Sequence, residues 1–356
     1  MHTYEDRNYY VPQPAKGTSA RRRLGGRPPS RRKKARRRRI LRHAARLAAM
    51  AGMAIIMAVS AGRIAGYAAD YLMARRASDA LRKSYYEEEL VQISDEEVAL
   101  SATPVCMESP APTVQQPAIA VADETAAPPA VQQPADTLLQ AKPYPANPKA
   151  TVKDRFKKLR RQNKDIIGWL TVDGMLDEAV VKRDNAYYLQ RDYRGYHNVN
   201  GAIFVDERCD LSTRPYTIML FGHNMKTGMM FGRLRDYENI RYYREHPFIT
   251  FDTAYENGRY VVFSAATIGL DPAKKNYLDL NGLLGDRVKR RERAISRLKE
   301  LSVHTAMIEV DAHDQILLLV TCVEDDMERR VIAARRVRTG ESEEQRARWV
   351  QQVDHK

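Results

Sequence analysis

Residues 316–322 read Ile-Leu-Leu-Leu-Val-Thr-Cys, an apolar run that ends on a cysteine. A short, uninterrupted apolar run of this kind predicts a strand buried on both faces. A second run, Tyr216-Thr-Ile-Met-Leu-Phe221, leads directly into Gly222-His223-Asn224-Met225. A third begins at Arg330 after a short acidic loop. These stretches predict strands whose ends carry a cysteine, a histidine and an arginine.

Shorter apolar runs with turn signals between them extend this pattern over the second half of the chain. Further strands are predicted at 166–172, 179–182, 202–206, 248–252, 259–267 and 306–310, and helices at 152–162, 229–246 and 286–301. Several short strands at short spacing are typical of a β-barrel or a sandwich. The predicted fold class is therefore mainly β with flanking helices.

Cys322, His223 and Arg330 form a plausible chemical set. A thiolate is a nucleophile when a neighbouring group ionises it, and an imidazole can do this and later protonate a leaving amine. A tetrahedral oxyanion then needs positive charge or hydrogen-bond donors, which an arginine supplies. The thioester formed in this way can be attacked by an amine or by water. No metal or other cofactor is required.

Each of these residues also has a purely structural explanation. A cysteine that closes an apolar strand is more often a small buried side chain. Histidines are commonly structural, and Arg330 lies among several other arginines. Cys106 lies in a Pro/Ala-rich stretch and Cys209 in a polar loop, so the three cysteines of the chain indicate no disulfide framework.

Positive charge is concentrated at the N-terminus. The chain has 356 residues and a net charge of +14, and residues 1–46 hold 16 of the lysines and arginines but only Glu5 and Asp6 as acids. Residues 47–69 are apolar except for Arg63, and about 20 residues are needed to cross a bilayer. Basic residues before this stretch predict a single span with a cytoplasmic N-terminus and an extracellular domain. Nucleic-acid binding by the tail, a cleaved signal peptide and a buried soluble helix remain alternatives.

Composition divides the rest of the chain. Residues 101–150 are rich in proline and alanine and repeat the pentapeptide Val-Gln-Gln-Pro-Ala at 114–118 and 131–135. Such composition cannot form a packed core and predicts a disordered linker. The expected organisation is a basic cytoplasmic tail (1–46), a transmembrane helix (47–69), a stalk and linker (70–150), a catalytic domain (151–340) and a charged C-terminal tail (341–356).

The segment from about Asn163 to Val337 resembles class B sortases, a family of cysteine transpeptidases. The resemblance is carried by separate motifs across roughly half of the chain: residues 163–174 (NKDIIGWLTVDG), 184–189 (DNAYYL), 201–206 (GAIFVD), 222–225 (GHNM), 230–232 (MFG) and 319–322 (LVTC), with Arg330 opening the last strand.

This resemblance implies a sortase-type closed β-barrel on the membrane of a Gram-positive bacterium. It implies that Cys322 cleaves a C-terminal sorting signal of secreted proteins and transfers the acyl group to a cell-wall precursor amine. His223 would be the acid/base, and Arg330 would stabilise the oxyanion or position the substrate. Thr321, Val320 and Val323 would line the substrate groove. The family pattern has Thr at Leu318, often Ser at Val320, and often Glu or Thr at Val323.

Two other classes of function are compatible with the sequence. One is a catalytically silent, membrane-tethered binding domain that keeps the barrel. The other is a cysteine peptidase that hydrolyses wall peptides. A thioester trapped at Cys322 would distinguish an enzyme from a binding domain, and an amide product formed with an added amine would distinguish a transpeptidase from a peptidase.

Overall fold

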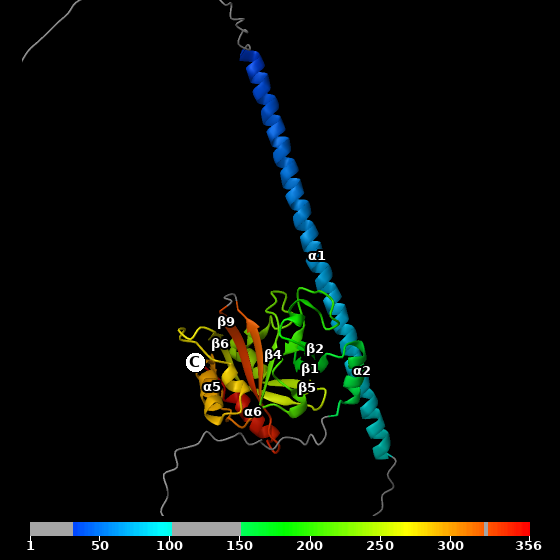
Figure 1. Ribbon diagram of the computed structural model, residues 1–356, viewed down its shortest axis with the longest axis vertical. Helices are drawn as coiled ribbons and strands as arrows, with labels where there is room; N and C mark the ends of the chain where they lie inside the picture. Colours follow the sequence, from blue (N-terminus) through cyan, green and yellow to red (C-terminus); the bar gives the residue numbers. More distant parts are fainter. Residues whose placement is uncertain (1–30, 102–150, 324–326) are drawn as a thin grey trace, which may run out of the picture. The chain divides into compact units, whose positions relative to one another are not determined.

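The computed structural model describes residues 31–101, 151–323 and 327–356 (Figure 1). The chain divides into two units, Met1–Ala65 and Gly66–Lys356, and the strands of the described residues lie in the second. The helices are α1 (Arg31–Ser101), α2 (Asp154–Gln162), α3 (Ile240–Glu245), α4 (Asn281–Leu284), α5 (Val288–Leu301) and α6 (Glu343–Gln351), with 3₁₀ helices η1 (Tyr187–Gln190), η2 (Leu211–Thr213) and η3 (Leu234–Glu238). The strands are β1 (Ile166–Val172), β2 (Leu176–Val181), β3 (Ile203–Val205), β4 (Thr217–Phe221), β5 (Phe248–Thr253), β6 (Arg259–Gly269), β7 (His304–Thr305), β8 (Ile316–Cys322), β9 (Glu328–Arg336) and β10 (Asp354–His355).

The main sheet closes into a barrel with the strand order β1-β2-β3-β4-β8-β9-β6-β5. The pairing of β1 with β5 completes the ring, so no strand of the barrel is left with a free edge. This confirms the predicted closed β-barrel with flanking helices. Two of the pairs, β2 with β3 and β4 with β8, are parallel, and the other neighbours are antiparallel.

The parallel pair β4–β8 positions the site. Ile316 pairs with Thr217 and Val320 pairs with Phe221, so the two strands run in register to the same end of the barrel. The chain then continues from β4 into His223, while β8 ends on Cys322. His223 and Cys322, which are about 100 positions apart in the sequence, are thereby brought to the same end of the barrel.

Helix α5 covers the barrel beside β6. Its apolar face buries Ile295 and Leu298, and its start at Val288 agrees with the amphipathic helix predicted at 286–301. Arg291 on the same helix is completely buried, and its guanidinium donates to the carbonyls of Ala312 and Asp314. A buried guanidinium needs such acceptors because an unpaired buried charge is costly.

Two predicted elements differ from the structure. The helix predicted over 229–246 is replaced by η3 and α3. Gly232 passes so close to the Met225 carbonyl oxygen that a Cβ there would clash with it, and Met230 has a φ of 50°, so the chain cannot be helical here. Residues 306–310 form no strand; the strand in this part of the chain is the shorter β7, which ends at Thr305 after pairing with β10.

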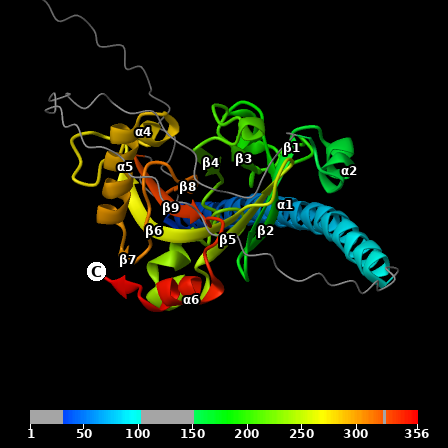
Figure 2. The same ribbon diagram turned by 90° about the horizontal axis from the view of Figure 1, so that it is seen from below.

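The second half of α1 packs against the barrel unit. Leu81 and Tyr85 are buried, and the Tyr85 ring stacks on that of Trp169 in β1, with centroids 4.3 Å apart and planes 8° apart. The Tyr85 hydroxyl donates to Asp252 at 2.8 Å and accepts from Arg155 at 2.9 Å. Figure 2 shows α2, β1 and β2 gathered around this part of α1. Packing by these residues was not anticipated for the expected stalk. Of the linker predicted at 101–150, Ser101 ends α1 and residues 102–150 lie outside the described residues.

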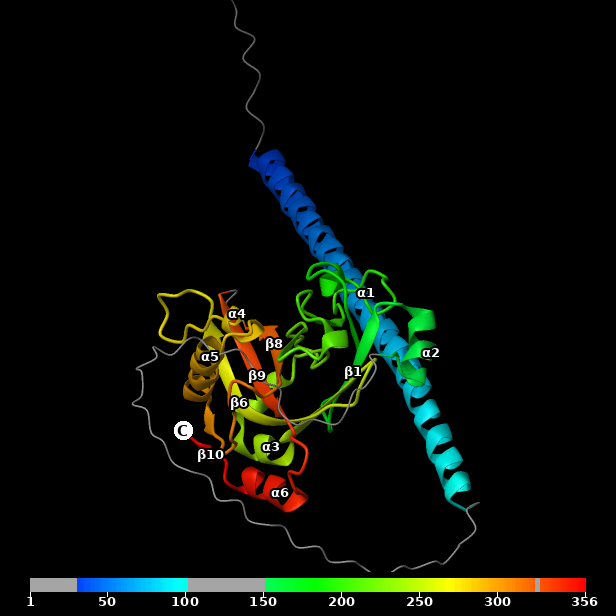
Figure 3. The same ribbon diagram turned by 60° about the horizontal axis from the view of Figure 1, so that its bottom comes forward.

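The C-terminal residues also join the barrel unit. Helix α6 buries Trp349, and β10 pairs with β7. Arg244 of α3 donates to the Val353 carbonyl at 2.6 Å, and Figure 3 shows α6 beside α3. The charged tail expected at 341–356 therefore carries apolar side chains that pack on the domain.

In the first unit, α1 carries the apolar stretch expected to cross a membrane. One helix in the described part of the chain, within Lys34–Glu87, is long and apolar enough to span a bilayer by length and composition. Its side chains are exposed over 34–50, where the basic residues lie. Residues 1–30 of the predicted basic tail lie outside the described residues.

Candidate active site

Cys322 ends β8 as an exposed free thiol after six buried residues. The residue before it, Thr321, is buried, and its hydroxyl donates to the Gly222 carbonyl at 2.7 Å. This hydrogen bond fastens the end of β8 to the segment that follows β4. The thiol is therefore presented from a fixed strand end rather than from a free loop.

His223 follows β4 and is oriented by the loop that contains η1. Its Nε2 lies 2.6 Å from the Leu189 carbonyl oxygen. A carbonyl oxygen can only accept, so Nε2 carries the proton in this contact and Nδ1 is the nitrogen left to accept one. Gly201 lies against the ring, where a Cβ would be 3.1 Å from His223 Cδ2. The ring is thus held in one tautomer and one orientation.

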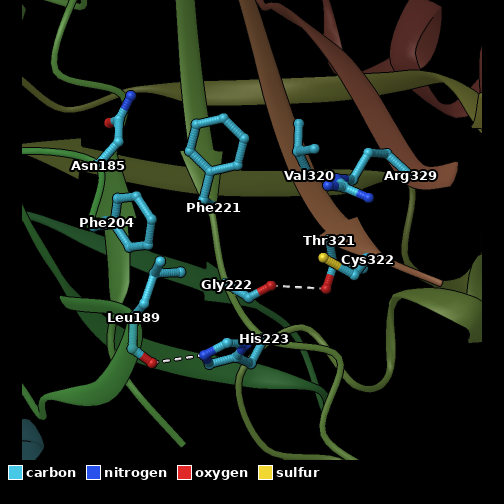
Figure 4. Close-up of a pocket in the computed structure, with 10 residues that line it drawn as sticks. All are labelled: Asn185, Leu189, Phe204, Phe221, Gly222, His223, Val320, Thr321, Cys322 and Arg329. Atoms are coloured by element: carbon cyan, nitrogen blue, oxygen red, sulfur yellow. Dashed lines mark hydrogen bonds between the residues drawn. The ribbon is translucent and has the colours of Figure 1, made fainter. Parts of the chain in front are cut away.

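Cys322 and His223 line one pocket with a volume of about 220 Å³ (Figure 4). The pocket is bounded by Asn185, Leu189, Phe204, Phe221, Gly222, His223, Val320, Thr321, Cys322 and Arg329. Its wall is mostly apolar, with the rings of Phe204 and Phe221 5.5 Å apart. An apolar wall beside a nucleophile can bind a substrate side chain and exclude water from the reacting bond.

The two arginines that open β9 lie differently. In the β8–β9 pairing, Cys322 is opposite Arg329 and Thr321 is opposite Arg330. Arg329 lines the pocket, whereas Arg330 donates through Nε and Nη2 to the Glu238 carboxylate of η3, at 3.0 and 2.7 Å. The structure therefore brings Cys322 and His223 together with Arg329, and directs the predicted Arg330 to Glu238.

Of the three residues predicted to line the substrate groove, two lie in this pocket and one does not. Val320 and Thr321 line the pocket, but Val323 does not, and its backbone N–H donates to the Glu328 carbonyl. Sequence reasoning did not single out Asn185, Leu189, Phe204, Phe221 or Arg329. Four of these lie in or directly beside the motifs quoted above, whereas Arg329 is identified by the β8–β9 pairing, which puts it opposite Cys322.

Cys209 has a structural explanation and no place in this pocket. It is buried, and its thiol donates to the Thr217 carbonyl at 3.4 Å. Burial raises the pKa of this thiol to about 11, which keeps it protonated and unreactive. Of the cysteines with described surroundings, only Cys322 is exposed. Residues 31–101, 151–323 and 327–356 contain no group of three His, Cys, Asp or Glu side chains that could hold a metal ion.

Comparison with known proteins assigns the family. The chain is 30% identical over 194 residues to sortase B of Listeria monocytogenes, a match that covers 51% of this chain and 73% of that protein. This chain belongs to the sortase B family. It is also 31% identical over 173 residues to the sortase B of Staphylococcus aureus, covering 48% of this chain and 68% of the relative. No family model matches the sequence.

Solved sortase B structures are also similar to part of this chain. A sortase B from Bacillus anthracis, in complex with AAEK1, is 30% identical, with a TM-score of 0.47 over 52% of this chain and 86% of that one. The sortase B of Staphylococcus aureus is 28% identical, with a TM-score of 0.47 over 54% of this chain and 90% of that one.

Proposed function

We propose that this sortase B family member is a membrane-anchored cysteine transpeptidase. Its substrates are secreted proteins with a C-terminal sorting signal, and its acceptor is an amine of the cell-wall precursor. The observation that supports this most directly is the shared pocket of Cys322 and His223, formed where the parallel strands β4 and β8 end. The free, exposed thiol of Cys322 is the only described one in a position to react with a peptide.

The reaction follows from the chemistry of these two side chains. The Cys322 thiol gives its proton to Nδ1 of His223 as its sulfur attacks the scissile carbonyl, a C–S bond forms, and the carbonyl π electrons move to oxygen. When the oxyanion collapses, the C–N bond breaks and His223 gives its proton to the leaving amine. The acceptor amine then attacks the thioester, His223 takes up a proton, and the thiolate leaves with the amide formed. One of the two arginines that open β9 supplies positive charge for the oxyanion.

Membrane anchoring and sidedness are part of the proposal. The apolar stretch of α1 follows a basic helical segment, which favours a cytoplasmic N-terminus and a catalytic domain outside the cell. Secreted proteins emerging from the membrane and wall precursors would both be accessible there. A sortase that acts at this surface is a thiol hydrolase and acyltransferase in one active site.

The test uses the full chain in detergent with Thr-containing sorting peptides and an amine acceptor. The wild type is expected to yield the amide product, and Cys322→Ala to yield none. His223→Ala should lower kcat by about 10²–10⁴, the usual contribution of a general acid–base. A buried thiol offers the matched control: Cys209→Ala should retain activity.

The alternatives predict different products. A cysteine peptidase would release only the free acid, whatever the concentration of the amine. A silent binding domain would form neither product nor a covalent adduct at Cys322. Either result, with a folded wild-type chain, would overturn the proposed transpeptidase.

A further inference from the structure

Large apolar side chains are exposed at only a few described positions outside α1, and most of them gather at one end of the barrel. The positions are Leu189, Tyr196, Val199, Leu270, Met307 and Met327. All of these except Met307 lie on segments at the end where β8 presents Cys322. Single exposed apolar residues need no explanation, but a group of them at one place marks an interaction surface.

Leu270 and Met327 lie beside the strand that follows Cys322. Leu270 directly follows β6, and Met327 directly precedes β9. The Leu270 N–H donates to the Met327 carbonyl at 2.9 Å, and the end of β6 pairs with the start of β9. Because Cys322 pairs with Arg329 near that start, both apolar side chains lie at the end of the barrel that carries the thiol.

Tyr196 and Val199 lie on the other side of the pocket, in the connection between η1 and β3. This connection begins at the edge of the pocket, because η1 supplies the Leu189 carbonyl that contacts His223 (Figure 4). The Tyr196 side chain is among the most exposed, at 67%, and the Arg194 guanidinium lies 5.2 Å from the centre of its ring. A tyrosine ring with an arginine beside it is typical of a membrane–water interface.

Helix α1 first meets the barrel at this same end. Its first buried side chains are those of Ala74 and Ala77, and the Ala77 carbonyl accepts from the Tyr193 hydroxyl in the connection between η1 and β3. Two turns later, Tyr85 donates to Asp252 near the end of β5. That end lies opposite the Cys322 end, because β5 runs antiparallel to β6. Residues 66–73 of α1 therefore leave the barrel from the Cys322 end (Figure 1).

The turns of α1 that precede the barrel contact have the character of a membrane boundary. Tyr67, Leu72 and Met73 are exposed, and aromatic and apolar side chains at the end of a span are typical of the interface. An α-helix rises about 1.5 Å per residue, so the barrel contact at Ala77 lies about 6 Å beyond Met73. A headgroup layer is about 5–8 Å thick. A helix that enters a bilayer up to Met73 therefore holds the Cys322 end of the barrel at the level of the headgroups.

We propose that this end of the barrel rests on the headgroup layer of the membrane that α1 enters, with Tyr196, Val199, Leu270 and Met327 immersed in it. These four residues form a membrane-facing rim around the pocket. The rim restricts the site to peptide segments held close to the bilayer. This inference rests on the membrane anchoring that is part of the proposed function.

The first experiment measures the immersion without any substrate. The full chain with Cys106→Ser and Cys322→Ala is placed in phosphatidylcholine–phosphatidylglycerol vesicles, and Tyr196→Cys or Leu270→Cys carries an environment-sensitive fluorophore. Lipids with a nitroxide on the headgroup should quench most of the emission at both positions. Met307→Cys is the matched control, because its side chain is 63% exposed and lies away from the Cys322 end, and its label should keep its emission.

A label within the apolar stretch separates this inference from the anchoring on which it rests. Ala58→Cys should be quenched by lipids with a nitroxide on the acyl chain. Quenching there, with none at positions 196 and 270 or with equal quenching at 307, would overturn the rim and leave the anchoring intact. An unquenched label at position 58 would remove the anchoring, and the rim with it.

The second experiment measures what the rim does for the reaction. Tyr196→Asp combined with Leu270→Asp should lower transpeptidation of a lipid-tethered sorting peptide in vesicles and leave that of the same untethered peptide in detergent unchanged. Met307→Asp should change neither. A folded double variant that loses both activities would place these side chains against the substrate and contradict the rim. If the wild type turns over no peptide, the proposed function fails, but the quenching still decides where the rim lies.

Discussion

His223 is held by a backbone carbonyl, which is the hydrogen-bond partner of its ring among residues 31–101, 151–323 and 327–356. The Leu189 oxygen lies 2.6 Å from Nε2, and the loop that presents it folds closely over Gly201. A carbonyl orients the ring and selects its tautomer without adding a full negative charge. Orientation of this histidine therefore depends on the local path of the backbone.

Gly201→Ala should disturb this orientation. Gly201 has a φ of +62°, and a Cβ there would lie 2.7 Å from the carbonyl oxygens of both Leu189 and Tyr188. The left-handed backbone alone costs about 1–2 kcal/mol for a residue with a Cβ, and displacement of the Leu189 carbonyl should also lower kcat. The measurement is kcat for transpeptidation together with the free energy of unfolding.

Gly195→Ala is the matched control for this substitution. Gly195 has a φ of +89°, but a Cβ there meets only the Tyr187 hydroxyl, at 3.2 Å. It should lose similar backbone stability while keeping its kcat. Equal losses of kcat in both variants would show that the Leu189 contact does not orient His223.

At this scale the sequence predicts nucleophile and base but not their surroundings. Cys322 and His223 each end an apolar run, which is visible in the sequence. The face on which Arg329 lies depends on the register of the β8–β9 hairpin, which the sequence between the strands does not specify. The contact between His223 and the Leu189 carbonyl cannot be predicted from the sequence for a different reason. Every residue has a backbone carbonyl, so only the path of the folded backbone shows which one lies beside His223.

Among the elements, the second half of α1 acts as part of the domain. Tyr85 and Leu81 are buried against it, and Tyr85 stacks on Trp169. Arg82 adds an ion pair with Asp177 at 2.8 Å. Burial of one large aromatic side chain is worth several kcal/mol, and here it is combined with hydrogen bonds. The helix is therefore expected to stay docked without a covalent connection through residues 102–150.

Cleavage of the linker tests this directly. A protease site inserted near residue 125 of the full chain is cut after purification in detergent, and the pieces are separated by size. The barrel piece should co-elute with the micelle that holds α1, because the docked face retains it. Leu81→Ala combined with Tyr85→Ala should release the barrel piece. Leu72→Ala, at a position 50% exposed on the same helix, should not, and release in that variant would point to a nonspecific effect.

A partly buried carboxyl at this interface makes the stability of the fold depend on pH. Burial raises the pKa of Glu178 in β2 to about 7 from an ordinary value of 4.5, although the hydrogen bond from Ser78 and the nearby Arg82 lower it. Asp177 and Asp79 add to the increase. The folded chain therefore keeps a proton on Glu178 that the unfolded chain has already released.

The sign of the effect follows from this difference in bound protons. Between pH 4.5 and about 7 the unfolded state binds fewer protons at this site, so the free energy of unfolding falls as pH rises and then levels off. The total loss is up to about 3 kcal/mol. Glu178→Gln should remove this slope in chemical denaturation measured across that range. Glu207→Gln, which changes an exposed carboxylate, should retain the wild-type dependence of the free energy of unfolding on pH. The wild-type dependence in Glu178→Gln would contradict the prediction.

At the scale of elements, periodicity predicted the barrel strands but not every helix. β1, β4, β5 and β8 begin and end within one residue of their expected positions, because their apolar runs are bounded by turn signals. The segment 229–246 has helical composition, yet Gly232 and Met230 follow a turn that only tertiary contacts require. The packing of residues 74–86 could not be predicted from their own sequence, because the surface of β1 and β2 that buries them comes later in the chain.

For the whole molecule, the decisive question is on which side of the membrane each part lies. Basic residues precede the apolar stretch of α1, and by the positive-inside rule we propose that the tail lies in the cytoplasm and Cys322 outside. Thiol labelling can test both ends of this arrangement, since Cys322 is exposed and Cys209 is buried.

The experiment uses a Gram-positive host that makes the full chain with Cys106→Ser. A membrane-impermeant maleimide should label Cys322 in intact cells and fail to label the Cys322→Ala variant. In that variant, Ser19→Cys should be labelled only after the membrane is opened if the tail lies inside, as proposed. A cleaved signal peptide would instead remove Ser19→Cys from the mature protein and shorten the chain. Labelling of Ser19→Cys in intact cells would reverse the proposed sidedness, and the catalytic domain could then not meet wall precursors.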